Sequence, residues 1–155
     1  MQVSEQLKNL LKSVEQLRLT PYLDQGGIPT VGHGNTFYEN GQKVKLTDPT
    51  ITAGRANQLF DNILGKFTQC VNNTIKRPMT QQQLDAFVML CYNCGMSAFS
   101  KPCKVVLYFN AGDMSMVQEW WIKSFVTANG VPSNGLVNRR KCEWDIFEKG
   151  IYKKW

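Results

Sequence analysis

The sequence predicts an α+β fold, in which a small antiparallel β-sheet lobe and a larger α-helical lobe are joined by a long helix. Three observations favour it: helical apolar spacing over residues 3–15, turn-rich alternating segments over 16–50, and helical patterns that resume at 52. The 155 residues suffice for one domain with its own hydrophobic core. We therefore expect a single domain, 1–155, without a separate accessory module.

The first helix is expected over residues 3–15. Apolar side chains there, among them Leu7, Leu10 and Leu11, repeat at intervals of three and four, and Ser4 is placed to cap the helix. Glycine, proline and asparagine then interrupt short alternating runs up to Pro49, which predicts the sheet lobe.

A tight turn is expected within the sheet lobe. Asn40-Gly41 is a strong hairpin signal and stands just before the alternating run 43–46. The lobe is therefore expected to contain a hairpin at this point.

Helical spacing over 52–75 predicts the helix that joins the lobes, and the helical lobe is expected over 79–155, packed with the first helix. Four helix starts are expected in it, each from a capping residue or a proline near the first turn. They lie at Thr80, at Ser100-Lys101-Pro102, at Asp113 and at Ser133 or Asn134, and their helices should run to about Cys94, Phe109, Val126 and Gly150.

The chain is basic. A net charge of +6 and a pI near 9.1 favour a polyanionic partner, and nucleic acid, an anionic membrane and the bacterial cell wall all fit. The longest apolar runs are far too short to span a bilayer. Glu5, Lys8 and Lys12 interrupt the first turns, so neither a secretory signal nor a membrane anchor is expected.

Histidine and cysteine content excludes several kinds of chemistry. A single histidine, His33, cannot supply the pair that most catalytic zinc sites use. Five cysteines are an odd number, and reduced, mostly buried thiols are expected. Cys91 and Cys94 form a CxxC without a second such pair, so packed thiols are favoured over a metal or redox site, and no cofactor or metal is expected.

Glu15 is the first candidate for catalysis. Steps of four from Leu7 and Leu11 place it at the end of the buried stripe of the first helix. Burial raises the pKa of a carboxyl group, which suits a general acid near neutral pH. The alternative is a glutamate at a helix end whose charge faces solvent.

Asp24 and Thr30 follow in the sheet lobe. Asp24 precedes Gln25-Gly26-Gly27, where a turn aspartate that bonds its own backbone is the alternative. Thr30 follows Pro29 in an extended segment, where a simple β-former is the alternative. Two acids with a nearby hydroxyl would suit a glycosidase, in which one acid protonates the leaving oxygen and the other handles water or the sugar cation.

The run from Glu15 to Gly34 resembles the active-site signature of the bacteriophage lysozymes, or endolysins, of glycoside hydrolase family 24. Their spacing of Glu, eight residues, Asp, five residues, Thr is met by Glu15, Asp24 and Thr30. Two further blocks are similar to the central and C-terminal helices of that family: Thr80, Leu84 to Phe87, Tyr92 to Gly95 and Phe99, then Gly135 to Arg140 with Glu143 and Phe147.

This resemblance implies a lysozyme-like fold with an active-site cleft between the lobes. It implies hydrolysis of the β-1,4 bond between N-acetylmuramic acid and N-acetylglucosamine in peptidoglycan, with Glu15 as general acid. Asp24 and Thr30 would position water, or Asp24 would act on the sugar carbon. An Arg139 guanidinium near Glu15 would orient the acid, the alternative being a surface arginine.

Three further residues are expected at the substrate, namely Asn35, Tyr92 and Asn93. An aromatic face suits a pyranose and an amide suits an N-acetyl group, although Tyr92 and Asn93 would equally serve as core and capping residues. Family members often carry an aromatic residue between the two glycines and histidine after the second. Here His33 stands between them and Asn35 follows, so His33 is expected to flank the cleft without catalysing.

Three other functions fit parts of the sequence. A lytic transglycosylase would cleave the same bond with one acid, and the presence of Asp24 and Thr30 argues against it. An amidase or peptidase using Cys94 and His33 is weaker. A basic binding module would use the C-terminal segment, where six cations (Arg139, Arg140, Lys141, Lys149, Lys153 and Lys154) accompany three acids and are interleaved with aromatic residues.

The resemblance also implies where the protein works. A family member without signal or anchor waits in the host cytoplasm until a holin permeabilises the membrane, and then acts on the wall from the periplasm. We expect a monomer that binds peptidoglycan, with no nucleic-acid partner and no stable membrane insertion.

Overall fold

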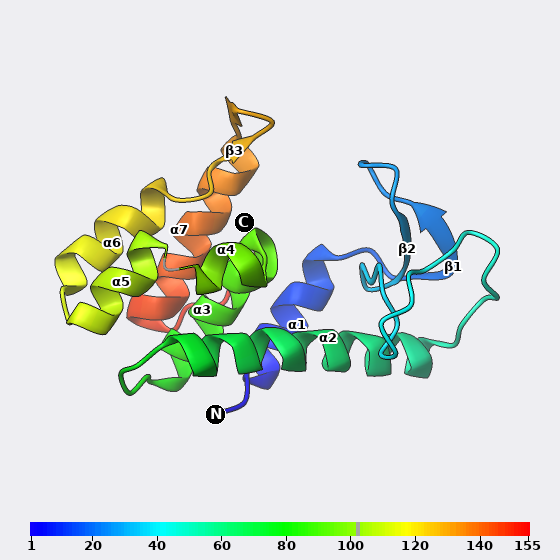
Figure 1. Ribbon diagram of the computed structural model, residues 1–155, viewed down its shortest axis with the longest axis horizontal. Helices are drawn as coiled ribbons and strands as arrows, with labels where there is room; N and C mark the ends of the chain where they lie inside the picture. The colour runs from blue at the N-terminus through cyan, green and yellow to red at the C-terminus, as the bar shows by residue number, and fades with distance from the viewer. Residues whose placement is uncertain (102) are drawn as a thin grey trace. The chain divides into compact units, whose positions relative to one another are not determined.

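The computed structural model describes residues 1–101 and 103–155, whose contacts divide the chain into two units. The sheet unit comprises residues 9–66, and the helical unit comprises residues 1–8 and 67–155. Helix α1 (Glu5–Val14) and helix α2 (Ala53–Thr74) contribute residues to both units (Figure 1). The α+β class predicted from the sequence is confirmed.

The sheet unit contains the predicted antiparallel sheet. Strand β1 (Arg18–Leu23) pairs with strand β2 (Pro29–Gly32), so that Tyr22 lies opposite Thr30, and the register shifts between Arg18 and Tyr22. The buried side chains beneath the sheet form a small aliphatic cluster, packed against two half-buried neighbours: Val31, Val44 and Leu59, with Tyr38 and Ile51.

A turn lies at the expected place, but of its residues Gly41 alone has a positive φ, +83°, and the Gly41 amide donates to the Tyr38 carbonyl at 3.0 Å, so the turn is centred on Glu39 and Asn40 instead of Asn40 and Gly41. The Tyr38 amide donates to the Gln42 carbonyl at 2.9 Å, and the Val44 amide donates to the Thr36 carbonyl at 2.9 Å. The run 43–46 is nevertheless no strand in the described chain, because its ladder is limited to one isolated bridge between Phe37 and Lys43.

In the helical unit, the third helix of the chain, α3, packs against α7 and α4, and a small hairpin projects between α6 and α7 (Figure 1). Its elements are α3 (Gln81–Cys94), α4 (Met96–Ser100), α5 (Lys104–Ala111), α6 (Met114–Lys123), β3 (Thr127–Ala128), β4 (Val131–Pro132) and α7 (Asn134–Lys149).

Helix caps follow the sequence closely. Thr80 and Gln83 form the expected capping box of α3, and Asp113 accepts a hydrogen bond from the Met116 amide at the start of α6. Ser133, rather than Asn134, caps α7, which ends at Gly150 in the left-handed conformation. At α1, the Leu7 amide donates to the Ser4 hydroxyl at 3.1 Å.

Two expected helix boundaries are wrong. Helix α4 ends at Ser100 and α5 begins at Lys104 after Cys103; Pro102, on which the expected start rested, lies outside the described residues. Helix α6 ends at Lys123 instead of Val126. Ser124 is extended and Phe125 has a φ of +53°, a conformation that no α-helix contains.

Aromatic side chains dominate the core of the helical unit. The Phe87 ring of α3 lies 5.0–6.0 Å, centroid to centroid, from four others, and mostly edge to face: Phe99, Phe109, Trp121 and Phe147. These arrangements are favoured by the ring quadrupoles. Segments far apart in the sequence therefore converge on one residue of α3.

Asp85 connects both ends of the chain to α3. Its fully buried carboxylate accepts hydrogen bonds from the Ser4 amide at 3.0 Å and from the Ser4 hydroxyl. It also accepts from the Tyr152 hydroxyl at 2.6 Å and from the Gln81 side chain at 3.0 Å. The cost of burying a charge is offset here by hydrogen bonds.

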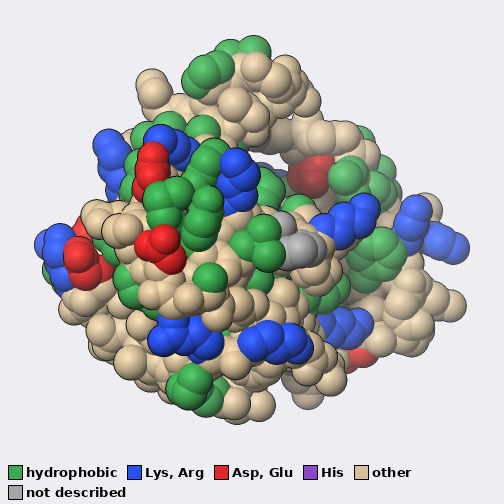
Figure 2. All heavy atoms as spheres, turned by 60° about the vertical axis from the view of Figure 1, so that its left-hand side comes forward, with side chains coloured by type: hydrophobic (Ala, Val, Ile, Leu, Met, Phe, Trp, Pro, Cys, Tyr) green, Lys and Arg blue, Asp and Glu red, His purple; other side chains and the backbone are tan. Residues whose placement is uncertain are grey.

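None of the helices in the described chain has the length and apolar character needed to cross a bilayer. Figure 2 shows Lys and Arg side chains spread over one face among polar and apolar groups instead of gathered into a single patch. On that face, the positive net charge is distributed.

Candidate active site

Glu15 follows the last residue of α1 and belongs to the sheet unit. Its amide still donates to the Leu11 carbonyl at 3.1 Å, so the helical geometry extends to this residue, and its side chain is half-buried. A Cβ added to Gly34 would lie 3.2 Å from Glu15 Oε2. Glycine at 34, with a φ of +93°, thus leaves room for the carboxylate.

Asp24 is held by the turn that it begins. Its Oδ1 accepts hydrogen bonds from the amides of Gly26 at 2.8 Å and Ile28 at 2.9 Å. Asp24 is therefore a turn aspartate that bonds the backbone of its own turn, which is the alternative stated from the sequence. Within the described residues Oδ2 has no donor, so it keeps its capacity to accept a proton or a hydrogen bond.

Thr30 lies opposite Tyr22 in the sheet and is only 3% exposed. Its hydroxyl donates to the Ile28 carbonyl at 2.8 Å, and the same carbonyl accepts from the Asp24 amide at 3.0 Å. The backbone of Ile28 thus joins Asp24 and Thr30 directly. Two of the three predicted catalytic side chains are brought together by one residue that the sequence did not single out.

His33 and Asn35 turn toward α2. His33 Nε2 lies 3.2 Å from Asn57 Oδ1, and its ring meets Phe60 edge-on at 5.5 Å. Burial lowers the pKa of His33, and the bond to Asn57 opposes that shift. Asn35 donates to the Leu59 carbonyl at 3.2 Å, while its buried Oδ1 has no partner among the residues described.

The remaining predicted residues belong to the helical unit. The Tyr92 ring is half-buried and lies 5.2 Å from the Phe67 ring. Asn93 is exposed, and its Oδ1 accepts from Arg140 Nη2 at 2.8 Å. Their roles at a substrate stay predictions.

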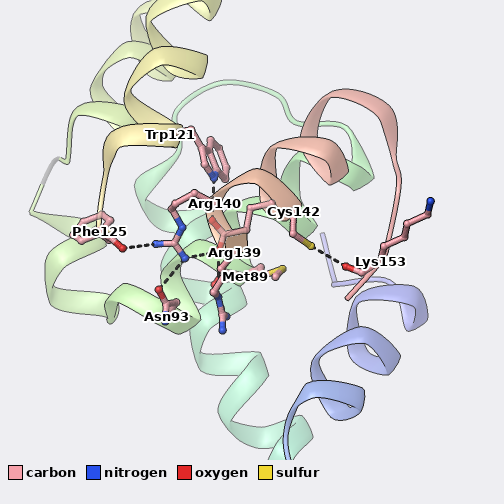
Figure 3. A network of polar contacts seen from close by, with 9 residues as sticks. Met89, Asn93, Trp121, Phe125, Arg139, Arg140, Cys142 and Lys153 are labelled. Atoms are coloured by element: carbon pink, nitrogen blue, oxygen red, sulfur yellow. Dashed lines mark hydrogen bonds and ion pairs between the residues drawn. The ribbon is translucent and has the colours of Figure 1, made fainter. Parts of the chain in front are cut away.

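Arg139 is buried in a cluster around Glu143, and Figure 3 shows Arg139 and Arg140 in this network of polar contacts. Its Nε lies 3.3 Å from Glu143 Oε1, its Nη2 donates to the Met89 carbonyl at 3.3 Å, and its guanidinium lies 4.7 Å from the centre of the Trp155 ring. The side chain is therefore packed within its own unit rather than lying loosely on the surface.

Glu143 itself is fully buried and is the centre of this cluster. Its Oε1 accepts from Arg140 at 2.6 Å and its Oε2 accepts from Trp121 Nε1 at 3.0 Å. Burial raises the pKa of Glu143, and the charges of Arg140 and Arg139 oppose that rise. Two of the six C-terminal cations thus neutralise a buried acid, which weakens the interpretation as a basic binding module.

The CxxC cysteines lie among the packed residues of α3. Burial raises the pKa of Cys91, and it raises the pKa of Cys94 to about 12. All five cysteines are free thiols. The described residues contain no group of three or more His, Cys, Asp or Glu side chains placed to hold a metal ion.

Comparison with known proteins identifies the family. The phage lysozyme family model matches residues 12–143. The endolysin of Acyrthosiphon pisum secondary endosymbiont phage 1 is 34% identical over 151 residues, which cover 96% of this chain and 99% of the relative.

Two solved structures support the same assignment. The endolysin from Escherichia coli O157:H7 phage FAHEc1 superposes with a TM-score of 0.87 at 38% identity, covering 99% of this chain and 98% of that one. The muramidase domain of SpmX from Asticaccaulis excentricus gives 0.79 at 28% identity, covering 96% and 98%. The chain therefore belongs to the phage lysozyme family and is a glycosidase of the lysozyme class.

Proposed function

We propose that this enzyme hydrolyses the β-1,4 bond between N-acetylmuramic acid and N-acetylglucosamine in bacterial peptidoglycan, and that it lyses the host at phage release. The observation that supports this most is the contact at Ile28. Its backbone holds Asp24 and Thr30 side by side, with one Asp24 oxygen and the Thr30 lone pairs left to act on a bound water or sugar. The names of the related endolysins agree with this function.

Glu15 acts as the general acid in this proposal. It donates a proton to the glycosidic oxygen, so that the leaving sugar departs as an alcohol and positive charge develops on the remaining ring. The half-buried position of Glu15 beside Gly34 agrees with a carboxyl group held in a defined orientation. Arg139 is proposed to orient this acid, and Asn35, Tyr92 and Asn93 to contact the glycan.

Asp24 and Thr30 complete the reaction in one of two ways. In an inverting reaction they take up the attacking water, and Asp24 accepts its proton. In a retaining reaction Asp24 attacks the sugar carbon, and water later releases the sugar. A carboxylate separation of about 6.5–9.5 Å suits the first and about 5–5.5 Å suits the second. The anomer released first, observed by NMR, distinguishes them.

The enzyme is proposed to work as a monomer and to reach the wall after the inner membrane is permeabilised, by a holin in the scheme implied by the family. Its +6 charge favours encounter with the anionic envelope. Added salt should therefore slow lysis of intact wall-exposed cells more than it slows cleavage of a short, uncharged glycan.

The decisive test compares Glu15→Gln with Glu5→Gln, a matched change at an exposed position in α1, the helix that Glu15 follows. We expect Glu15→Gln to release reducing ends from purified peptidoglycan at least about 100-fold more slowly, because it cannot supply the proton. Glu5→Gln should match the wild type. Wild-type turnover by folded Glu15→Gln would refute the assignment, and anhydro-muramic ends in the product would identify a transglycosylase instead.

A further inference from the structure

A cavity of about 290 Å³ lies within the helical unit, between α7 and the residues that follow it. Its volume is close to the lower limit of small-ligand sites, about 300 Å³, so it suits a ligand of about the size of one sugar. Two walls enclose it. They include Asn138 and Lys141 on α7, and Ile151, Lys153, Lys154 and Trp155 after it.

The C-terminal wall is held in place by contacts with α7. The Cys142 thiol donates to the Lys153 carbonyl at 3.0 Å, as Figure 3 shows, which fixes the backbone of this wall. The Trp155 ring lies 4.7 Å from the Arg139 guanidinium, a cation–π contact that fixes the indole. The cavity is therefore a formed part of the helical unit.

The six C-terminal cations fall into two groups. Arg139 and Arg140 pair with Glu143. Lys149 pairs at 3.3 Å with Asp145, the acidic residue of the cavity lining. The remaining three, called here the cavity lysines, are exposed, have no carboxylate partner within the described part of the chain, and all line the cavity: Lys141, Lys153 and Lys154.

The cavity lysines favour a ligand with more than one negative charge. A carboxylate carries a single charge, whereas a phosphomonoester carries about 1.5–2 near pH 7 and offers three strong acceptor oxygens. Lysine binds phosphate as a point charge, without the planar fork with which arginine matches a carboxylate. The charge of the lining therefore favours a phosphate group.

The rest of the lining favours a sugar beside that phosphate. Trp155 contributes an indole, a flat surface on which a pyranose can pack, and the 39% exposed Ile151 side chain adds apolar area. The Asn138 amide supplies both donors and an acceptor, which suit hydroxyl and acetamido groups. Inorganic phosphate alone would leave these groups without a partner.

We infer that this cavity binds a phosphorylated sugar, with the phosphate against the cavity lysines and the sugar ring against Trp155. A glycan of the bacterial envelope that carries phosphate would supply such a group. Binding there would hold the enzyme at the envelope through a second site that takes no part in bond cleavage, so the inference goes beyond the proposed function. An anionic membrane has the same charge, but the concave site with an indole and an amide favours a discrete sugar.

The test titrates the protein with N-acetylglucosamine 1-phosphate and follows the indole N–H signal of Trp155 by NMR. We expect a saturable shift, with weaker binding of inorganic phosphate and of N-acetylglucosamine. Lys153→Gln and Lys154→Gln should each raise the Kd of the sugar phosphate about two- to fivefold, the range for exposed ion pairs. Lys101→Gln is the matched control, because Lys101 is an exposed lysine of the same unit outside the cavity lining.

Several results would overturn the inference. They are the absence of a Trp155 shift, equally tight binding of N-acetylglucosamine or of the carboxylate N-acetylmuramic acid, and an unchanged Kd in both variants with thermal unfolding like that of the wild type. Lysine-dependent binding to phosphatidylglycerol vesicles, without binding of the soluble sugar phosphate, would assign the surface to a membrane instead. Because the readout is binding, a failure of the proposed hydrolysis leaves this result unaffected.

Discussion

Asp24 and Thr30 of the sheet unit are held in a different way from Asp85 and Glu143 of the helical unit. In the sheet unit, Asp24 and Thr30 bond backbone groups no more than four residues away. In the helical unit, Asp85 and Glu143 are held largely by side chains, some from segments distant in the sequence. A polar group fixed by its own turn depends little on the remaining fold, whereas a group fixed by distant partners makes the fold depend on it.

The cores differ in the same sense. The sheet unit packs the aliphatic cluster of Val31, Val44 and Leu59 together with the buried Phe60 ring, whereas the helical unit packs four rings around Phe87. Large aromatic side chains bury the most surface per residue. We therefore expect stability to reside mainly in the helical unit and the proposed catalytic residues to lie in the less stable unit, as is common for functional regions.

The largest expected effect is on the helical unit. Glu143→Ala should lower the free energy of unfolding by about 3–5 kcal/mol, because it leaves the Arg139 and Arg140 charges buried without their shared partner. Urea unfolding measures this. Glu148→Ala, at an exposed position of the same helix, should change it by less than about 0.5 kcal/mol. An equal loss of unfolding free energy in the two variants would mean that the cluster around Glu143 stabilises the fold no more than an exposed residue does.

A smaller effect on stability, with a larger effect on turnover, is expected in the sheet unit. Gly34→Ala forces a residue with a side chain into a φ of +93°, which costs about 1–3 kcal/mol, and places its Cβ 3.2 Å from Glu15 Oε2. Glu15 must then move, so activity per folded molecule should fall.

Gly41→Ala provides the control for that change. Gly41 also has a positive φ, +83°, but a Cβ there meets no atom within 4 Å. The Gly41→Ala variant should lose about as much stability as Gly34→Ala, but it should keep the wild-type turnover per folded molecule. If both variants lose the same activity, backbone strain rather than contact with Glu15 explains the loss.

The smallest effect concerns pH. Because burial lowers the pKa of His33, the unfolded chain takes up this proton at a higher pH than the folded chain does. The contribution of His33 to stability is therefore fully present at pH values above its ordinary pKa of 6.5. It is lost as the pH falls through the lower pKa that His33 has in the folded protein. His33→Gln should reduce the loss of unfolding free energy between pH 7.5 and 5; an identical loss in both proteins would contradict this.

Local features were predictable from the sequence. The caps at Ser4, Thr80, Asp113 and Ser133 depend on side chains within three residues of the amides that they bind, so spacing alone identifies them. The turn at Asp24 is equally local. The hairpin of β3 and β4 was missed, although Asn129-Gly130 is the same turn signal as Asn40-Gly41, because its strands have only two residues each.

Long-range features were not predictable in this way. Ser4 and Asp85 are 81 residues apart, and no local pattern pairs them. A count of charges grouped Arg139 and Arg140 with the exposed lysines, but pairing with Glu143 buries both. The catalytic candidates came from motif spacing, whereas the part played by Ile28 depends on backbone geometry that side-chain types do not specify.

The carboxylate of Asp85 also has a consequence for the ends of the chain. Ser4 near one terminus and Tyr152 near the other bond the same Oδ2 atom, and both are anchored on α3. Loss of either contact leaves a buried charge with fewer donors, which makes the other contact more costly to break. The two termini are therefore thermodynamically linked, and trimming or fusing one of them is expected to alter the order of the other.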